Sequence, residues 1–303
     1  MDWKKIRKSI PRFMGWFAIL AGSSVIKLIP RRWLYGFANT IANLGFALAV
    51  KQRKIALECL HLAFGNELSK KEVERIARDS FIYMARSGFE LISMMDKPAI
   101  IKQCIGFENK KHLDAALARG KGVILVSAHF GNFPLLLSRL SQEGYNISGI
   151  MRPMRDARVE KIFLQKREKY HVKTIYSQPR NVCVERTIRA LRNNEIVFIH
   201  IDQNFGTGGV FVNFFGRQAA TATGPIIFAQ RTQASLLPCF ILRQKNNHHK
   251  IVFEPPLDLK EGKSPKETVL INIQRLTDII ESYIRRYPAE WSWIHRRWKT
   301  KPN

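Results

Sequence analysis

Residues 121–144 read KGVILVSAHFGNFPLLLSRLSQEG, and this stretch decides the fold class. Its first part, KGVILV, is short, apolar and rich in β-branched residues, which is typical of a buried strand. Its last part, LLLSRLSQEG, has helical spacing and ends in a glycine. His129 therefore falls where a strand ends and a helix begins, and Pro134 follows five residues later. We interpret a titratable ring at such a junction as functional.

The alternation of strands and helices continues along the chain beyond residue 105. YNISGIM, VKTIY and EIVFIHI predict strands, and the segments of about 10–15 residues between them have helical spacing. This order predicts an α/β fold with a mostly parallel central sheet flanked by helices. Further on, LLPCFILRQ and KIVFEPPL predict a hairpin, with His248 and His249 at a solvated tip, before a long helix from SPKETVL.

The composition is that of a folded, strongly basic protein. Of 303 residues, 46% are apolar, and 50 Lys and Arg against 24 Asp and Glu give a net charge of +26. Such an excess predicts an anionic partner, namely nucleic acid, membrane headgroups or phosphorylated substrates. The scattered cysteines favour free thiols in a reducing compartment. Because the sequence has no metal-ligand spacing, we predict no metal and no cofactor.

The first 50 residues distinguish between these anionic partners. Residues 1–12 are rich in Lys and Arg, and residues 13–26 and 33–50 are largely apolar, with tryptophans near the ends of the first run. Basic and aromatic anchors of this kind are typical of a membrane interface. A pair of buried core helices is the alternative. Nucleic-acid binding is not predicted, because the basic residues are spread along the chain and no zinc-finger, RNP or basic-zipper pattern occurs.

The chain is predicted to have three parts. Residues 1–50 form membrane-anchoring helices, residues 51–104 form a helical segment, and residues 105–303 form the α/β body, with the second and third parts in one globular domain. Within the second part, Ser69 followed by Glu72 predicts a capping box that begins a long helix.

Polar side chains follow two strands of the predicted sheet. His129 follows VILVSA, and Asp202 and Gln203 follow EIVFIHI. Since ligands bind beyond the carboxyl ends of the strands in open α/β sheets, His129 and Asp202 share one site if their strands are neighbours. A histidine there serves as general base for a hydroxyl. A turn cap is the alternative role for Asp202, and His171 and His200 are expected to be packed histidines.

Cationic side chains and a glycine turn complete the candidate site. Arg152 ends a strand and Arg217 lies in GTGGVFVNFFGRQ, and we expect both to bind a phosphate, with Gln203 also contacting substrate. A surface ion pair is the alternative for Arg152. Gly131 and Asn132 are expected to offer backbone N–H groups to phosphate or an oxyanion at the helix start. Such a site suits a substrate that is both fatty and phosphorylated.

These motifs together resemble the late acyltransferases of lipid A biosynthesis, within the lysophospholipid and glycerol-phosphate acyltransferase superfamily. The resemblance covers essentially the whole chain and rests on HFGNF, the RP after the next strand, DQNFGTGGVFVNFFGRQAATATGP and PAEWSWIHRRWK. It implies an α/β enzyme of lipopolysaccharide biosynthesis on the cytoplasmic face of the cell inner membrane. The implied reaction moves a fatty acyl chain from acyl carrier protein, or acyl-CoA, to a hydroxyl of a lipid A precursor or related (lyso)lipid, without a metal.

The sequence departs from the family pattern at one catalytic position. In the family, a Glu or Asp five places after the histidine orients the ring, whereas this chain has Pro134, a residue tolerated in the first helical turn. Three outcomes follow. Another acid orients the ring, with Asp202 the first choice and then Glu143 or Asp156. Alternatively, His129 works alone, or the chain is a non-catalytic, lipid-binding relative.

The C-terminal motif mixes Trp291, Trp293 and Trp298 with basic residues. We interpret this mixture as a solvated anchor, or as a surface that contacts lipid headgroups or an acidic carrier protein.

Overall fold

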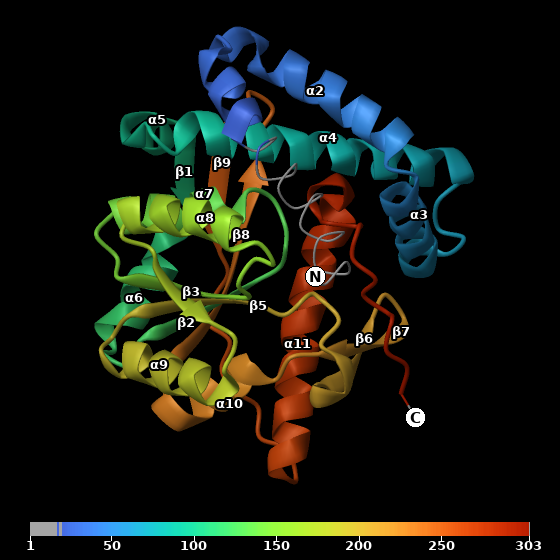
Figure 1. The fold of residues 1–303 in the computed structure, drawn as a ribbon. Helices are drawn as coiled ribbons and strands as arrows, with labels where there is room; N and C mark the ends of the chain where they lie inside the picture. Colours follow the sequence, from blue (N-terminus) through green and yellow to red (C-terminus); the bar gives the residue numbers. More distant parts are fainter. Residues whose placement is uncertain (1–16, 18–19, 303) are drawn as a thin grey trace, which may run out of the picture.

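A seven-stranded sheet in the order β1-β9-β8-β2-β5-β3-β4 forms the centre of the molecule (Figure 1). The structure is a computed structural model that describes residue 17 and residues 20–302, so the Lys- and Arg-rich residues 1–12 and, of the apolar run 13–26 that follows, residues 13–16 and 18–19 lie outside the described residues. Its strands are β1 (Ile105–Glu108), β2 (Val123–Ser127), β3 (Ile147–Met151), β4 (Lys173–Tyr176), β5 (Ile196–His200), β8 (Ser235–Arg243) and β9 (His249–Phe253). All neighbours are parallel except β8 and β9, which confirms the predicted mostly parallel α/β fold and the hairpin.

Alternate residues of the central strand β2 face two separate cores, because successive side chains of a strand point to opposite faces. Val123 and Leu125 pack in one core, and Ile124 and Val126 pack in the other. The flanking helices are α5 (Pro98–Cys104), α6 (Lys110–Ala118), α7 (Phe133–Gln142), α8 (Ala157–Lys169), α9 (Arg180–Arg192), α10 (Gly224–Thr232) and α11 (Pro265–Arg286). A sheet covered on both faces explains why its strands read as continuous apolar runs.

The N-terminal helices form a layer of their own above the sheet. In Figure 1, α2 (Arg31–Leu48) lies along α4 (Lys70–Met94), and α3 (Val50–Phe64) descends beside them. Ser69 and Glu72 form the predicted capping box at the start of α4. Among the described residues, no single helix combines the length and apolar composition of a membrane span, and α2 and α3 meet that description only together, as a pair bent by 88°.

Two parts of the fold escape prediction from the sequence. The hairpin of β6 (Val210–Phe214) and β7 (Arg217–Thr221) packs against α11, and only its phenylalanine-rich first strand is recognisable in the sequence. The edge strand β1 is also missed. β1 (IGFE) has only four residues, one of them glycine, and β7 (RQAAT) has one β-branched residue and no aromatic one, so neither carries a clear strand signal of its own.

The C-terminal tryptophans belong to the core, so their interpretation as a solvated anchor or a contact surface is wrong. Trp291, Trp293 and Trp298 are buried, and Arg297 is 0% exposed. Each indole N–H has an internal acceptor, as buried tryptophans require: Trp293 donates to the carbonyl of Pro288 at 2.7 Å, for example. The aromatic residues that suggest an interface therefore pack within the protein, while Arg296 and Lys299 of the same motif are exposed.

Candidate active site

The site lies where β2 and β5 end side by side. The two strands are parallel neighbours with Ser127 opposite His200, so the residues that follow them are brought together. His129 Nδ1 lies 2.9 Å from Oδ1 of Asp202, and the backbone N–H of His129 donates to Oδ2 of the same carboxylate at 2.9 Å. Asp202 is thus bound to both the ring and the main chain of His129.

Asp202 is held as a carboxylate by its surroundings. It is 3% exposed, and its Oδ2 accepts a further hydrogen bond from Nε1 of Trp291 at 2.8 Å. Burial raises the pKa of Asp202, but the charge of His129 and the hydrogen bonds from His129 and Trp291 outweigh burial and hold this pKa well below its usual range. A carboxylate only accepts hydrogen bonds, so we assign the ring proton of His129 to Nδ1.

This assignment leaves Nε2 of His129 with a free lone pair. No described residue hydrogen bonds to Nε2, and the side chain of His129 is 30% exposed, so the ring is open on one side. Burial lowers the pKa of His129, but the charge of Asp202 and the hydrogen bond to it leave this pKa raised. The pair has the arrangement of a general base with an orienting carboxylate.

Pro134 occupies the first turn of α7 without disturbing it, as expected. Of the three acids considered as substitutes for the one missing there, only Asp202 contacts His129. Glu143 pairs with Arg139 at the far end of α7, and Asp156 caps α8.

The loop after His129 is fixed by the C-terminal segment. Gly131 has a φ of +57°, and a Cβ there would lie 2.0 Å from the carbonyl oxygen of Ile241. Its N–H donates to the carbonyl of Glu290 at 2.9 Å, and the N–H of Ser292 donates to the carbonyl of His129 at 3.1 Å. The predicted role of the Gly131 N–H in binding an oxyanion or phosphate is therefore corrected, since this donor is already used within the protein.

The Asn132 side chain also points into the protein instead of capping α7. It is 2% exposed, and its Nδ2 donates to the carbonyl of Ser87 and to Oε2 of Glu90, both at 3.1 Å. The side-chain amide of Asn132 therefore has buried partners, whereas the predicted role of its backbone N–H in binding an oxyanion or phosphate stays a prediction. The Asn132 side chain thus links the loop of His129 to α4 by hydrogen bonds.

Glu90 lies at the centre of a buried polar cluster that sequence reasoning missed. Its carboxylate binds Arg243, accepts from Tyr35 Oη at 3.0 Å and lies 3.1 Å from Nε2 of His249. Burial raises the pKa of Glu90, but His249 and Arg243 outweigh it and lower this pKa to about 2. His249 is buried, so its predicted place at a solvated tip is wrong. These residues come from distant parts of the sequence, and no local pattern joins them.

The remaining predicted site residues make no recorded contact with the side chains of the His129–Asp202 pair. Arg152 is exposed after β3, beside β5, and has no ion pair with any described residue. Arg217 Nε donates to the carbonyl of Leu62 on α3 at 2.8 Å, and the carbonyl of Gln203 accepts from Arg297 at 3.2 Å. Arg152 thus has a free cationic group at the edge of the sheet where His129 lies, whereas Arg217 is engaged elsewhere.

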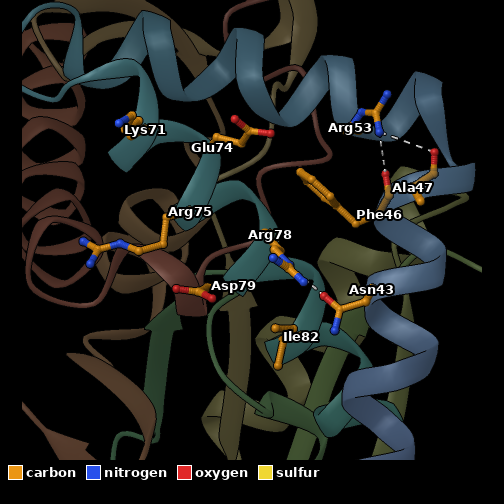
Figure 2. Close-up of a pocket in the computed structure, with 10 residues that line it drawn as sticks. All are labelled: Asn43, Phe46, Ala47, Arg53, Lys71, Glu74, Arg75, Arg78, Asp79 and Ile82. Carbon is orange, nitrogen blue, oxygen red and sulfur yellow. Dashed lines mark hydrogen bonds between the residues drawn. The ribbon is translucent and has the colours of Figure 1, made fainter.

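A separate hollow of about 580 Å³ opens between α2, α3 and α4 (Figure 2). It is lined by cationic side chains, of which Arg53 and Arg78 bind groups of α2, while Lys71 and Arg75 form no salt bridge with a described residue. Glu74 also lines it. None of the lining residues belongs to the His129 site. Within the described part of the chain, no group of three or more His, Cys, Asp or Glu is arranged to hold a metal ion.

An α/β sheet with a hydrogen-bonded histidine and carboxylate at its open edge has an arrangement that suits general-base chemistry on a hydroxyl. The chain belongs to the bacterial lipid A biosynthesis acyltransferase family, whose profile matches residues 2–300, and it is therefore an acyltransferase, as the resemblance implies. It is 25% identical to the lipid A biosynthesis lauroyltransferase of Escherichia coli (strain K12), over 96% of this chain and 94% of that protein. It is 23% identical to the palmitoleoyltransferase of the same organism, over 83% and 80%.

A second group of relatives has a different name. The chain is 29% identical to a phosphatidylinositol mannoside acyltransferase of Mycobacterium tuberculosis (strain CDC 1551 / Oshkosh), over 62% of this chain and 58% of that protein.

The close approach at Gly131 predicts a large effect of adding one methyl group. Gly131→Ala places a Cβ against the Ile241 carbonyl in a left-handed conformation, and we expect it to lower the free energy of unfolding by about 3 kcal/mol or more. Gly36→Ala in α2 is the control, because no atom of the described residues beyond its chain neighbours and its own helix backbone lies within 4 Å of its Cβ position, and it should stabilise by about 0.5–1 kcal/mol. Denaturant unfolding in detergent measures both, and equal stability of the two variants would contradict this view of the loop.

Proposed function

We propose that this protein transfers a fatty acyl chain from acyl carrier protein, or from acyl-CoA, to a hydroxyl of a lipid A precursor or related (lyso)lipid. The observation that carries the proposal is the hydrogen-bonded pair of His129 and Asp202, with Nε2 of His129 free. Family membership supplies the acyl-transfer reaction, and the pair supplies the base that this reaction requires.

In the proposed reaction, Nε2 of His129 takes the proton of the acceptor hydroxyl as its oxygen attacks the thioester carbonyl carbon. The carbon–sulfur bond then breaks, the leaving thiolate takes the proton from the imidazolium, and an ester and a free thiol result. Asp202 holds the ring by Nδ1 and stabilises the imidazolium. It performs the task of the acid that the family has at position 134.

The alternative of a non-catalytic, lipid-binding relative depends on the absence of that acid. Because the buried carboxylate of Asp202 lies 2.9 Å from Nδ1 of His129, the reason for considering a non-catalytic relative no longer applies, and the enzymatic proposal is preferred.

The acceptor is proposed to carry both fatty chains and phosphate. The relatives are named as acyltransferases of lipid A biosynthesis and of phosphatidylinositol mannoside, and the unpaired Arg152 suits an anionic group near the site. Both candidate donors are anionic, which fits the net charge of +26.

We further propose that the protein acts at the cytoplasmic face of the cell inner membrane, through α2. Trp33, Phe37, Ile41, Leu44 and Leu48 recur every three or four residues on one face of this helix. All of them are at least half exposed, in contrast to the buried face of α2 that packs on α4. An exposed apolar stripe in a basic protein suits an interface with anionic lipid.

Acyl transfer by the purified protein tests the proposed reaction. Thioesters of acyl carrier protein and of CoA, with several chain lengths, would be offered with lipid A precursors and lysophospholipids, and products identified by mass spectrometry. We expect turnover in the wild type and a loss of about 10³-fold or more in His129→Ala. Pro134→Glu should change turnover less than about threefold, because Nδ1 already has a carboxylate partner.

Wild-type turnover in His129→Ala would exclude the proposed base. A large gain in Pro134→Glu would show that Asp202 does not replace the missing acid. No product with any acceptor, together with specific lipid retention, would favour the non-catalytic relative.

Vesicle flotation tests the membrane surface. Phe37→Ser combined with Leu44→Ser should lower binding to phosphatidylethanolamine–phosphatidylglycerol vesicles by about tenfold, because apolar area is lost from the stripe. Leu270→Ser, at an exposed leucine of α11, is the control and should bind as the wild type does. Equal binding of all three proteins would contradict a role of α2.

A further inference from the structure

The ring of His200, at the carboxyl end of β5, stacks on the ring of His129. The ring centroids are 4.2 Å apart and the planes differ by 28°. His200 is the last residue of β5, two positions before Asp202, and no hydrogen bond joins it to His129 or Asp202 in the described structure. Its contact with the base is therefore through the ring face.

Two phenylalanines hold His200 in this position. Phe133 lies edge-on to His129 at 5.6 Å and to His200 at 4.5 Å, and Phe198 lies edge-on to His200 at 4.8 Å. Nε2 of His200 is buried and has no partner among the described residues. Packing, not hydrogen bonding at this atom, thus keeps the ring against His129.

The charges around the pair favour a neutral His200. Burial and the nearby charge of His129 lower the pKa of His200 well below its usual range, although Asp202 acts in the opposite direction. His295, on the C-terminal segment, also faces the site, and its pKa is lowered mainly by burial. When His129 takes a proton, its neighbour therefore presents a neutral aromatic face to the imidazolium.

We propose that His200 is a positioning residue for the proposed acyl transfer, and that its ring fixes the plane of the His129 imidazole so that Nε2 faces the acceptor hydroxyl. The hydrogen bond to Asp202 restrains the ring at one atom, Nδ1, and small changes in the ring plane that keep this bond still displace Nε2 on the opposite side. The ring stack limits these changes. This inference rests on the proposed function of His129 as the base.

Replacing His200 with phenylalanine and with alanine separates ring stacking from other roles. His200→Phe keeps a stacking face, and we expect its kcat to stay within about threefold of the wild type. His200→Ala should lower kcat by about tenfold or more with little change in KM, because the base is misplaced after substrate binds. His171→Asn is the control for loss of a histidine; residue 171 has a φ of +54°, which asparagine tolerates, and lies outside the site.

The pH profile and NMR report on the His129 ring itself, so a loss of global stability alone would not move them. In His200→Ala, water reaches the His129 ring and weakens the effect of burial that lowers its pKa, so the acid limb of kcat/KM should move to higher pH. Histidine-selective NMR of the substrate-free protein should show the same rise in the His129 pKa and loss of the ring-current shift. His200→Phe should retain both wild-type values.

Each outcome decides the inference separately from the proposed function. No acyl transfer by the wild type would refute the function, while NMR would still test the stack. Wild-type kcat and His129 signals in His200→Ala would overturn the positioning role. A folded His200→Phe as slow as His200→Ala would also overturn it and indicate a polar role for His200. If thermal melting shows that His200→Ala is unfolded, His200→Leu, which fills the space without a ring, takes its place with the same expected loss.

Discussion

The site depends on one buried carboxylate that joins three segments of the chain. Asp202, after β5, accepts from the backbone and the ring of His129, after β2, and from the indole of Trp291 in the C-terminal segment. A buried carboxylate is stable only when donors surround it, so the donors and the acid fix one another. The same carboxylate sets the tautomer of His129 and anchors the C-terminal segment through Trp291.

The supporting structure extends from this carboxylate in two directions. On one side, the Glu290 carbonyl and the Ser292 N–H bind the main chain of the His129 loop. On the other side, Asn132 binds Glu90, which also accepts from Tyr35 of α2. The helix proposed to meet the membrane is therefore linked by hydrogen bonds to the loop that carries the proposed base.

Much of this arrangement could be predicted from the sequence, because parallel strands leave clear apolar runs and their carboxyl ends share one edge. That reasoning brings His129 and Asp202 together and selects Asp202 as the first choice among the acids that could contact the ring in place of the one missing at position 134. It fails where a residue's partners are distant in the sequence. Trp291 and His249 lie in segments rich in basic and polar residues, which suggests exposed positions. Their contacts with Asp202 and Glu90, which are distant in the sequence, form only in the folded chain.

In the proposed mechanism Asp202 orients the His129 ring and raises its pKa. The pH dependence of kcat/KM in Asp202→Asn tests both effects. We expect the plateau of kcat/KM in Asp202→Asn to lie about 10²–10⁴-fold below that of the wild type. We also expect an acid limb shifted to lower pH, because the carboxylate that raises the pKa of His129 is gone. Asp258→Asn, at an exposed acid, should match the wild type in both respects. An Asp202→Asn enzyme with wild-type plateau and acid limb would contradict the account.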